Sequence, residues 1–340
     1  MSGSSLDIPY CFKGAHFPQV GFKDFPDGFC TLDNRNLFPR EKFIMLHGEE
    51  EIKQIVYGKL EPALLLISRI ILHHWASYSV FLRRKQPDDN DIFITEDHLV
   101  DVTKDEVVRS IQNLIPDFDF NPDMNIGSSC CAETALRPDS PRDLVVLNYD
   151  LISVLLSIRS DNAKISALVF LAVCIGHGIA HVLEFRMIRG GKLNAQSRAF
   201  LTPPGLTCRE AGTAWESNVF GGKVVPICSR PSDLLRIQGL CINGSAVGYK
   251  MMKINEEWMH GLFNETHWQT TKRPTQAPLD VYADYAHLMP DDPEELSESR
   301  KEKTHGNDVR VQTGSPTKMP RFLRPQRRHG CKRVLLAGDS

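Results

Sequence analysis

The chain has 340 residues, of which 41% are hydrophobic and 24% are charged, values typical of a soluble globular protein. The formal net charge is −2, but residues 300–340 hold 11 Lys and Arg against 3 Asp and Glu and carry about +8, which leaves about −10 on residues 1–299. An acidic body of this kind does not bind nucleic acid unaided, so no nucleic-acid partner is expected.

The first hundred residues predict an irregular arm followed by helices. Residues 1–40 are rich in Phe, Gly, Pro and Asp without a sustained period, which predicts an irregular N-terminal arm. Helical character begins near Glu49, and Pro62 suits the first turn of a helix that runs toward Phe81. Further on, Thr103-Lys104-Asp105-Glu106 predicts a capping box at the start of another helix.

The middle of the chain predicts a loop, a strand and a helix. Residues 116–140 are rich in Pro, Asp and Ser and predict a long loop. Leu144-Val145-Val146-Leu147 is typical of a short strand, and Asn148 then suits the N-cap of a helix that ends near Arg159.

Residues 165–183 form the most apolar stretch of the chain. Its length touches the threshold for a membrane span, but two histidines and two glycines lie within it and Glu184 follows at once. We therefore expect a helix buried in a protein core, ended by Gly190-Gly191, and no membrane span.

The last third predicts short elements and then a tail. Residues 208–220 are compatible with a helix that ends at Gly221-Gly222, residues 224–227 with a short strand and residues 256–263 with a helix. Beyond them the composition is polar and charged, which indicates disorder. The fold class expected is mainly α with a few short strands, divided into an irregular arm (1–40), a helical domain (41–285) and a disordered basic tail (286–340).

Two histidines in the apolar helix carry the strongest chemical signal. The segment Gly176-His177-Gly178-Ile179-Ala180-His181 places both imidazoles on one helix face, one turn apart. Their ring nitrogens can converge on one ion at zinc distances, and apolar surroundings favour the neutral, coordinating form. Two core histidines that bind no metal are the alternative interpretation.

Three carboxylates are candidates for the third metal ligand. Glu210 lies on a following helix, with enough intervening chain to bring that helix back across the first. Glu184 shares one helix face with the two histidines and would complete a local set of two histidines and one carboxylate, which is also a set that binds non-haem iron. Glu216 more simply supports a ligand, or pairs with Arg186 or Arg209.

Two motifs together resemble uncharacterised zincin-like proteins of mushroom-forming fungi. The first is HxxxH in an apolar helix, and the second is a following helix that contains Glu210-Ala211-Gly212, Glu216 and Phe220-Gly221-Gly222. The resemblance covers about residues 140–270. It implies a zincin-like metalloprotease core and a gluzincin-type metal site with His177, His181 and Glu210 as ligands. Zn²⁺ is the ion expected, with Fe²⁺ or Mn²⁺ as alternatives.

One position departs from that pattern. Those proteins usually read HExxH, and the Glu after the first histidine serves as the general base, whereas this chain has Gly178 there. Since general-base assistance contributes roughly 10²–10⁴-fold, proteolysis is expected to be lost or altered. A zinc-metallopeptidase-like protein that binds a peptide or small ligand is therefore the first hypothesis. A metal-dependent enzyme acting on a small molecule, in fungal specialised metabolism, is the second, and a structural or interaction protein without metal is the third.

The location expected is cytoplasmic. The first residues lack the basic segment followed by an apolar one that is typical of a secretory signal. The nine cysteines include no CxxC pair, which is consistent with reduced thiols. The basic cluster at residues 321–333 makes a nuclear location the alternative.

Overall fold

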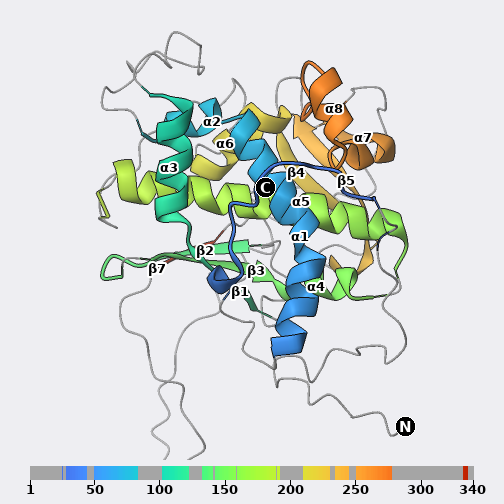
Figure 1. Ribbon diagram of the computed structural model, residues 1–340, viewed down its shortest axis with the longest axis horizontal. Helices are drawn as coiled ribbons and strands as arrows, with labels where there is room; N and C mark the ends of the chain where they lie inside the picture. Colours follow the sequence, from blue (N-terminus) through green and yellow to red (C-terminus); the bar gives the residue numbers. More distant parts are fainter. Residues whose placement is uncertain are drawn as a thin grey trace, which may run out of the picture.

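The structure is a computed structural model that is mainly helical with two small sheets (Figure 1). It describes the following parts of the chain: residue 25 and residues 28–43, 50–82, 102–121, 132–140, 142–157, 159–188, 190–191, 210–229, 234–244, 250–277 and 332–335. The predicted fold class of helices with a few short strands is confirmed.

Helix α5 (Asp161–Leu183) runs through the middle of the molecule, and α1 crosses it (Figure 1). The Ser160 side chain caps its first turn by accepting from the Ala163 amide. Every residue from Ala163 to Leu183 is buried, as the apolar run predicts. The helix is long and apolar enough to cross a membrane, but its most apolar window is packed wholly inside the protein. A π-helical turn (Glu184–Ile188) continues it, and Gly190 and Gly191 follow with positive φ angles.

Helices α1 (Glu50–His73) and α3 (Lys104–Leu114) pack against α5, and the short helix α2 (Ala76–Ser79) contacts α3. The capping box at Thr103 is confirmed, since both of its reciprocal hydrogen bonds form. The expectation that Pro62 begins a helix is wrong, because Pro62 lies inside α1. A proline in a helix interior removes one backbone hydrogen bond. Here the fully buried apolar side chains on either side of it, such as Leu60 and Leu64, hold the helix in place.

The first sheet has the order β1-β3-β2-β7, built from β1 (Asp117–Asn121), β2 (Ala132–Leu136), β3 (Leu144–Asn148) and β7 (Lys332–Leu335). Strands β1 and β3 are parallel, and β2 runs antiparallel to both β3 and β7. The long loop expected over residues 116–140 is therefore wrong, since two strands lie in it. Phe118 and Phe120 alternate with aspartates and are buried, so the Pro- and Asp-rich composition concealed an amphipathic strand.

The predicted strand at 144–147 and the Asn148 cap are confirmed. Asn148 accepts a hydrogen bond from the Asp150 amide and begins α4 (Tyr149–Leu155), which ends four residues before the predicted Arg159. An ion pair joins the first sheet to the end of the central helix, because the Arg186 Nε atom lies 2.7 Å from the carboxylate of Asp143, which precedes β3.

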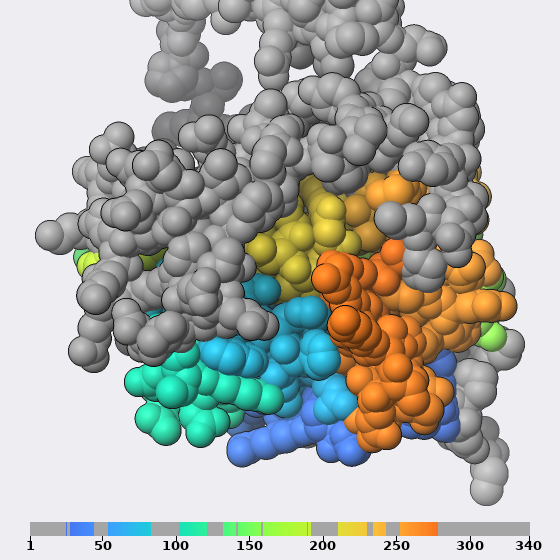
Figure 2. Space-filling view, turned by 90° about the horizontal axis from the view of Figure 1, so that it is seen from above, coloured from blue at the N-terminus to red at the C-terminus, as the bar shows by residue number. Residues whose placement is uncertain are grey.

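The remaining elements lie on the other side of α5. Glu210 is the N-cap of α6 (Ala211–Phe220), which ends at Gly221 with φ +85°. The second sheet has the order β4-β5-β6 and is followed by two short helices; the bounds are β4 (Lys223–Cys228), β5 (Ile237–Gly244), β6 (Lys250–Lys253), α7 (Glu256–Gly261) and α8 (Glu265–Thr270). Figure 2 shows the segment 210–229 in yellow between residues of α1 and α2 in blue and the 250–277 segment in orange.

The outer parts of the chain also contribute to this core. Leu32, Leu37 and Phe38 of the predicted arm are buried in the same hydrophobic cluster as α1 and α5, while residues 1–24 lie outside the described residues. Strand β7 falls within the segment 286–340 that was expected to be disordered, and for those four residues pairing with β2 corrects the expectation. The rest of that tail lies outside the described residues.

Candidate metal centre

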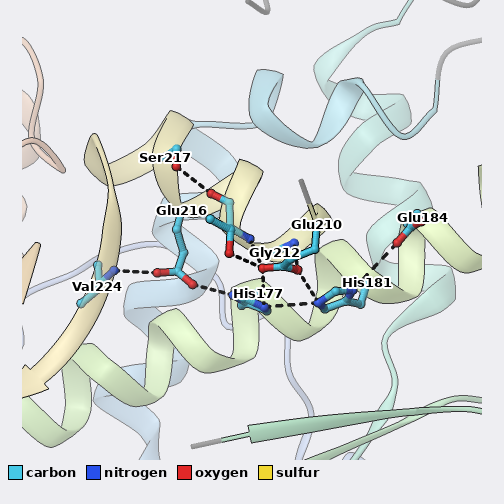
Figure 3. A network of polar contacts seen from close by, with 9 residues as sticks. His177, His181, Glu184, Glu210, Gly212, Glu216, Ser217 and Val224 are labelled. Carbon is cyan, nitrogen blue, oxygen red and sulfur yellow. Dashed lines mark hydrogen bonds and ion pairs between the residues drawn. The ribbon is translucent and has the colours of Figure 1, made fainter. Parts of the chain in front are cut away.

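His177 and His181 project from the same face of α5, one turn apart, with 6% and 5% of their surfaces exposed. Their Nε2 atoms face each other at 3.3 Å (Figure 3). The sequence predicted this convergence from the spacing of four residues alone, because helix geometry places positions i and i+4 above one another.

Glu210 comes from α6 and reaches the same point. As the N-cap it accepts hydrogen bonds from the amides of Gly212 (2.8 Å) and Thr213 (2.6 Å), and it also accepts from the Thr213 hydroxyl. These bonds fix the carboxylate with Oε1 3.4 Å from His177 Nε2 and Oε2 2.7 Å from His181 Nε2. One residue therefore starts helix α6 and joins it to α5.

These three side chains form a group that could hold a metal ion. One ligand atom from each lies within 4.8 Å of the others. Zinc–nitrogen bonds of about 2.0–2.1 Å in a tetrahedron separate neighbouring ligand atoms by about 3.3–3.4 Å. The separations of 3.3 Å between the two Nε2 atoms and 3.4 Å between His177 Nε2 and Glu210 Oε1 match that edge length, whereas the 2.7 Å between His181 Nε2 and Glu210 Oε2 is the length of a hydrogen bond.

The electrostatics of the group call for a positive charge at its centre. His177 Nδ1 lies 2.5 Å from Glu216 Oε1, so in a neutral His177 ring Nδ1 carries the proton and Nε2 has a bare lone pair. His181 Nε2 lies 2.7 Å from Glu210 Oε2, the length of a hydrogen bond, so without a metal ion this nitrogen carries the proton that it donates to the carboxylate. A metal ion bound between the two Nε2 atoms and the carboxylate would take the place of that proton.

The pKa values follow from the same arrangement. Burial lowers the pKa of His177, but the charges and hydrogen bonds of Glu210 and Glu216 outweigh it and raise the pKa to about 10. Burial also lowers the pKa of His181, but Glu184 and Glu210 outweigh it, so the pKa is raised overall. Burial raises the pKa of Glu210, but the two histidines hold it far below its usual range. Without a metal ion the two histidines therefore hold protons, which a divalent ion has to displace.

Glu216 and Glu184, the alternative ligands, lie on the Nδ1 sides of the His177 and His181 rings, away from Glu210 on the Nε2 sides (Figure 3). Glu216 is buried in α6, and its second oxygen accepts from the Val224 amide at 2.7 Å, which secures it behind His177. Glu184 reaches the Nδ1 side of His181 from the π-helical turn. Carboxylates that hold the outer nitrogen of a ligating histidine fix its tautomer and orientation. Arg186, one suggested partner of Glu216, pairs with Asp143 instead.

Glycines allow the helices to approach at the site. A Cβ atom at Gly212 would lie 2.0 Å from the Nε2 and Cδ2 atoms of His177, and one at Gly176 would lie 2.2 Å from the Trp215 ring. Both positions require glycine because α5 and α6 touch there. Gly212 was not predicted as a site residue, because the side chain that it makes room for, His177, belongs to another helix.

Gly178 faces the first sheet. A Cβ at this position would lie 2.8 Å from the Val145 side chain of β3 and 3.5 Å from the Thr134 hydroxyl of β2. Both residues are fully buried, so the space that a glutamate would need after His177 is occupied by the sheet.

A comparison with protein-family models, curated proteins and solved structures found no match. Function is therefore inferred from the chemistry of the site.

Proposed function

We propose that this protein binds one divalent metal ion, with Zn²⁺ as the first choice, through His177 Nε2, His181 Nε2 and a carboxylate oxygen of Glu210. The observation that carries the proposal is the convergence of two imidazole nitrogens and one carboxylate, with one ligand atom from each within 4.8 Å of the others. Imidazole and carboxylate also suit Fe²⁺ and Mn²⁺, which remain the alternative ions.

Three protein ligands leave one coordination position for an exogenous ligand. Structural zinc sites use four protein ligands, whereas sites that exchange a ligand use three. The Glu210 side chain is 30% exposed while both histidines are nearly buried, so an incoming group approaches from the start of α6. When bound there, the ion supplies Lewis acidity to that group.

Peptide hydrolysis by the usual zincin route is not part of this proposal. Its general base belongs at position 178, where glycine has no side chain and the sheet leaves no room for one. We therefore propose a zincin-like metal-binding core without proteolytic activity. This agrees with the resemblance to fungal zincin-like proteins and adds a physical reason for the departure from it.

The second candidate is a metal-dependent enzyme that acts on a small molecule. A set of two histidines and one carboxylate with open positions is the arrangement of non-haem iron oxygenases, and that chemistry needs no carboxylate at position 178. Elemental identity separates the two candidates, since iron in the site favours the second.

The test is elemental analysis of the purified full-length protein beside a His177→Ala/His181→Ala variant. We expect about one zinc per chain in the wild type and less than a tenth of that in the variant. A matched control, His73→Ala/His260→Ala, removes two exposed histidines and should keep the metal. Absence of metal from the wild type, or equal metal in both proteins, would contradict the proposal and favour a structural protein with core histidines.

A further inference from the structure

Strand β7 is a short edge strand that comes from far along the chain. Its four residues pair antiparallel with β2 in the register Glu133↔Leu335, Thr134↔Val334, Ala135↔Arg333 and Leu136↔Lys332. Residues 278–331 separate it from the end of the preceding described segment. The edge of β2 is therefore covered by a strand that is distant in sequence from the other described elements (Figure 1).

The covered edge lies next to the metal-binding helix. β2 and β3 both pack on α5, and a Cβ at Gly178 would meet side chains from each of them. Thr134, whose hydroxyl is 3.5 Å from that position, is the residue directly paired with Val334. Strand β2 thus packs beside Gly178, the residue after the proposed ligand His177, and pairs with β7 along its edge.

We propose that the outer edge of β2 is a peptide-binding edge, and that its ligand is the chain's own C-terminal segment Lys332–Leu335, which can leave and rebind. Main-chain hydrogen bonds supply most of the affinity when an extended segment adds to a sheet edge, so a separate peptide of the same sequence makes the same ladder. The ligand is defined as an extended segment of two basic residues followed by two aliphatic ones, antiparallel to β2.

The opposite edge of this sheet is closed differently. Phe43 forms an isolated parallel bridge with Phe118 of β1, and the Phe43 and Phe118 rings stack at a centroid distance of 5.1 Å. That closure is built from buried aromatic side chains of the core, whereas β7 is a four-residue ladder. Opening a backbone ladder of four residues disturbs the core less than moving buried aromatic side chains does, so β2 is the edge of this sheet that can exchange its occupant.

The experiment uses the full chain and a labelled peptide of residues 332–338. The variant Arg333→Pro/Val334→Pro blocks the ladder, because consecutive amides of a strand point alternately toward and away from the partner and proline has none. The matched control Ala337→Pro/Gly338→Pro places the same two prolines outside the paired residues. Peptide binding is read by fluorescence anisotropy, and protection of the β2 amides is read by hydrogen exchange.

We expect the peptide to bind the Arg333→Pro/Val334→Pro variant at least tenfold more tightly than the wild type or the control. It should also restore protection of those amides within residues 132–136 that face β7. A chain ended after residue 331 should behave like the variant, which separates edge opening from an effect of proline on folding. Equal peptide binding by all these proteins, no binding by any, or unchanged protection of β2 in both edge-opened proteins would overturn the proposal. Zinc content measured on the same samples tests the metal site separately.

Discussion

Adding one methyl group at Gly212 should abolish metal binding. The Cβ of an alanine there would lie 2.0 Å from His177 Nε2, where ordinary contacts begin near 3.4 Å. The imidazole must therefore move by about 1.4 Å, whereas metal–ligand bonds tolerate deviations of about 0.2 Å. His177 is then lost as a ligand. Because removing even an outer partner of a ligand lowers affinity about 10–100-fold, we expect Gly212→Ala to weaken zinc binding by at least about 100-fold.

The matched control is Gly176→Ala. A Cβ at that position would lie 2.2 Å from the Trp215 ring of α6 and 2.8 Å from Ile67 of α1, a clash of similar size within apolar contacts of α5. Overpacking of this kind costs about 1–3 kcal/mol, so both variants should unfold at lower temperature than the wild type. Only Gly212→Ala should lose zinc, as measured by competition with a chromogenic chelator. Wild-type zinc affinity in a folded Gly212→Ala protein would refute this reasoning.

Three further changes have defined outcomes. Gly178→Glu should lower the melting temperature and restore no peptidase activity, because the new Cβ lies 2.8 Å from Val145; cleavage of a fluorogenic peptide library by this variant would contradict that. Glu216→Gln should weaken zinc binding about 10–100-fold in a calorimetric titration, and more than Glu184→Gln does, because the Glu216 contact is 2.5 Å and the Glu184 contact 3.9 Å. Burial, with a smaller contribution from the neighbouring histidine, lowers the pKa of His74 to about 4, so its stabilising contribution is present above about pH 6.5 and falls as the pH drops toward 4. Urea unfolding should accordingly show a loss of at most about 2 kcal/mol between pH 7 and pH 5 that is absent in His74→Phe.

Local signals in the sequence were sufficient for the central part of the site. The spacing of His177 and His181 within an apolar run predicts their convergence because it depends only on helix geometry. The capping signals at Thr103 and Asn148 also depend on neighbouring residues and are confirmed. The place of Glu210 followed from its distance along the chain and from resemblance, and the structure brings it to both histidines.

The features that the sequence did not reveal depend on distant partners. Strand β2 is buried on both faces, so it has no alternating pattern, and β7 exists through pairing with it. Pro62 lies inside a helix because core contacts from other elements outweigh its local preference. The role of Gly212 appears only once α5 and α6 are in contact, since the atom that it makes room for belongs to His177.

The most direct test of the account is X-ray absorption at the zinc edge on the zinc-loaded full-length protein. We predict a shell of nitrogen and oxygen atoms at about 2.0–2.1 Å with the outer-shell scattering of two imidazoles and no sulfur at about 2.3 Å. The His177→Ala/His181→Ala variant, treated with zinc in the same way, should hold less than a tenth of the metal and give no comparable absorption edge. A sulfur shell, or an unchanged spectrum in that variant, would contradict the assignment of His177, His181 and Glu210 as the metal ligands.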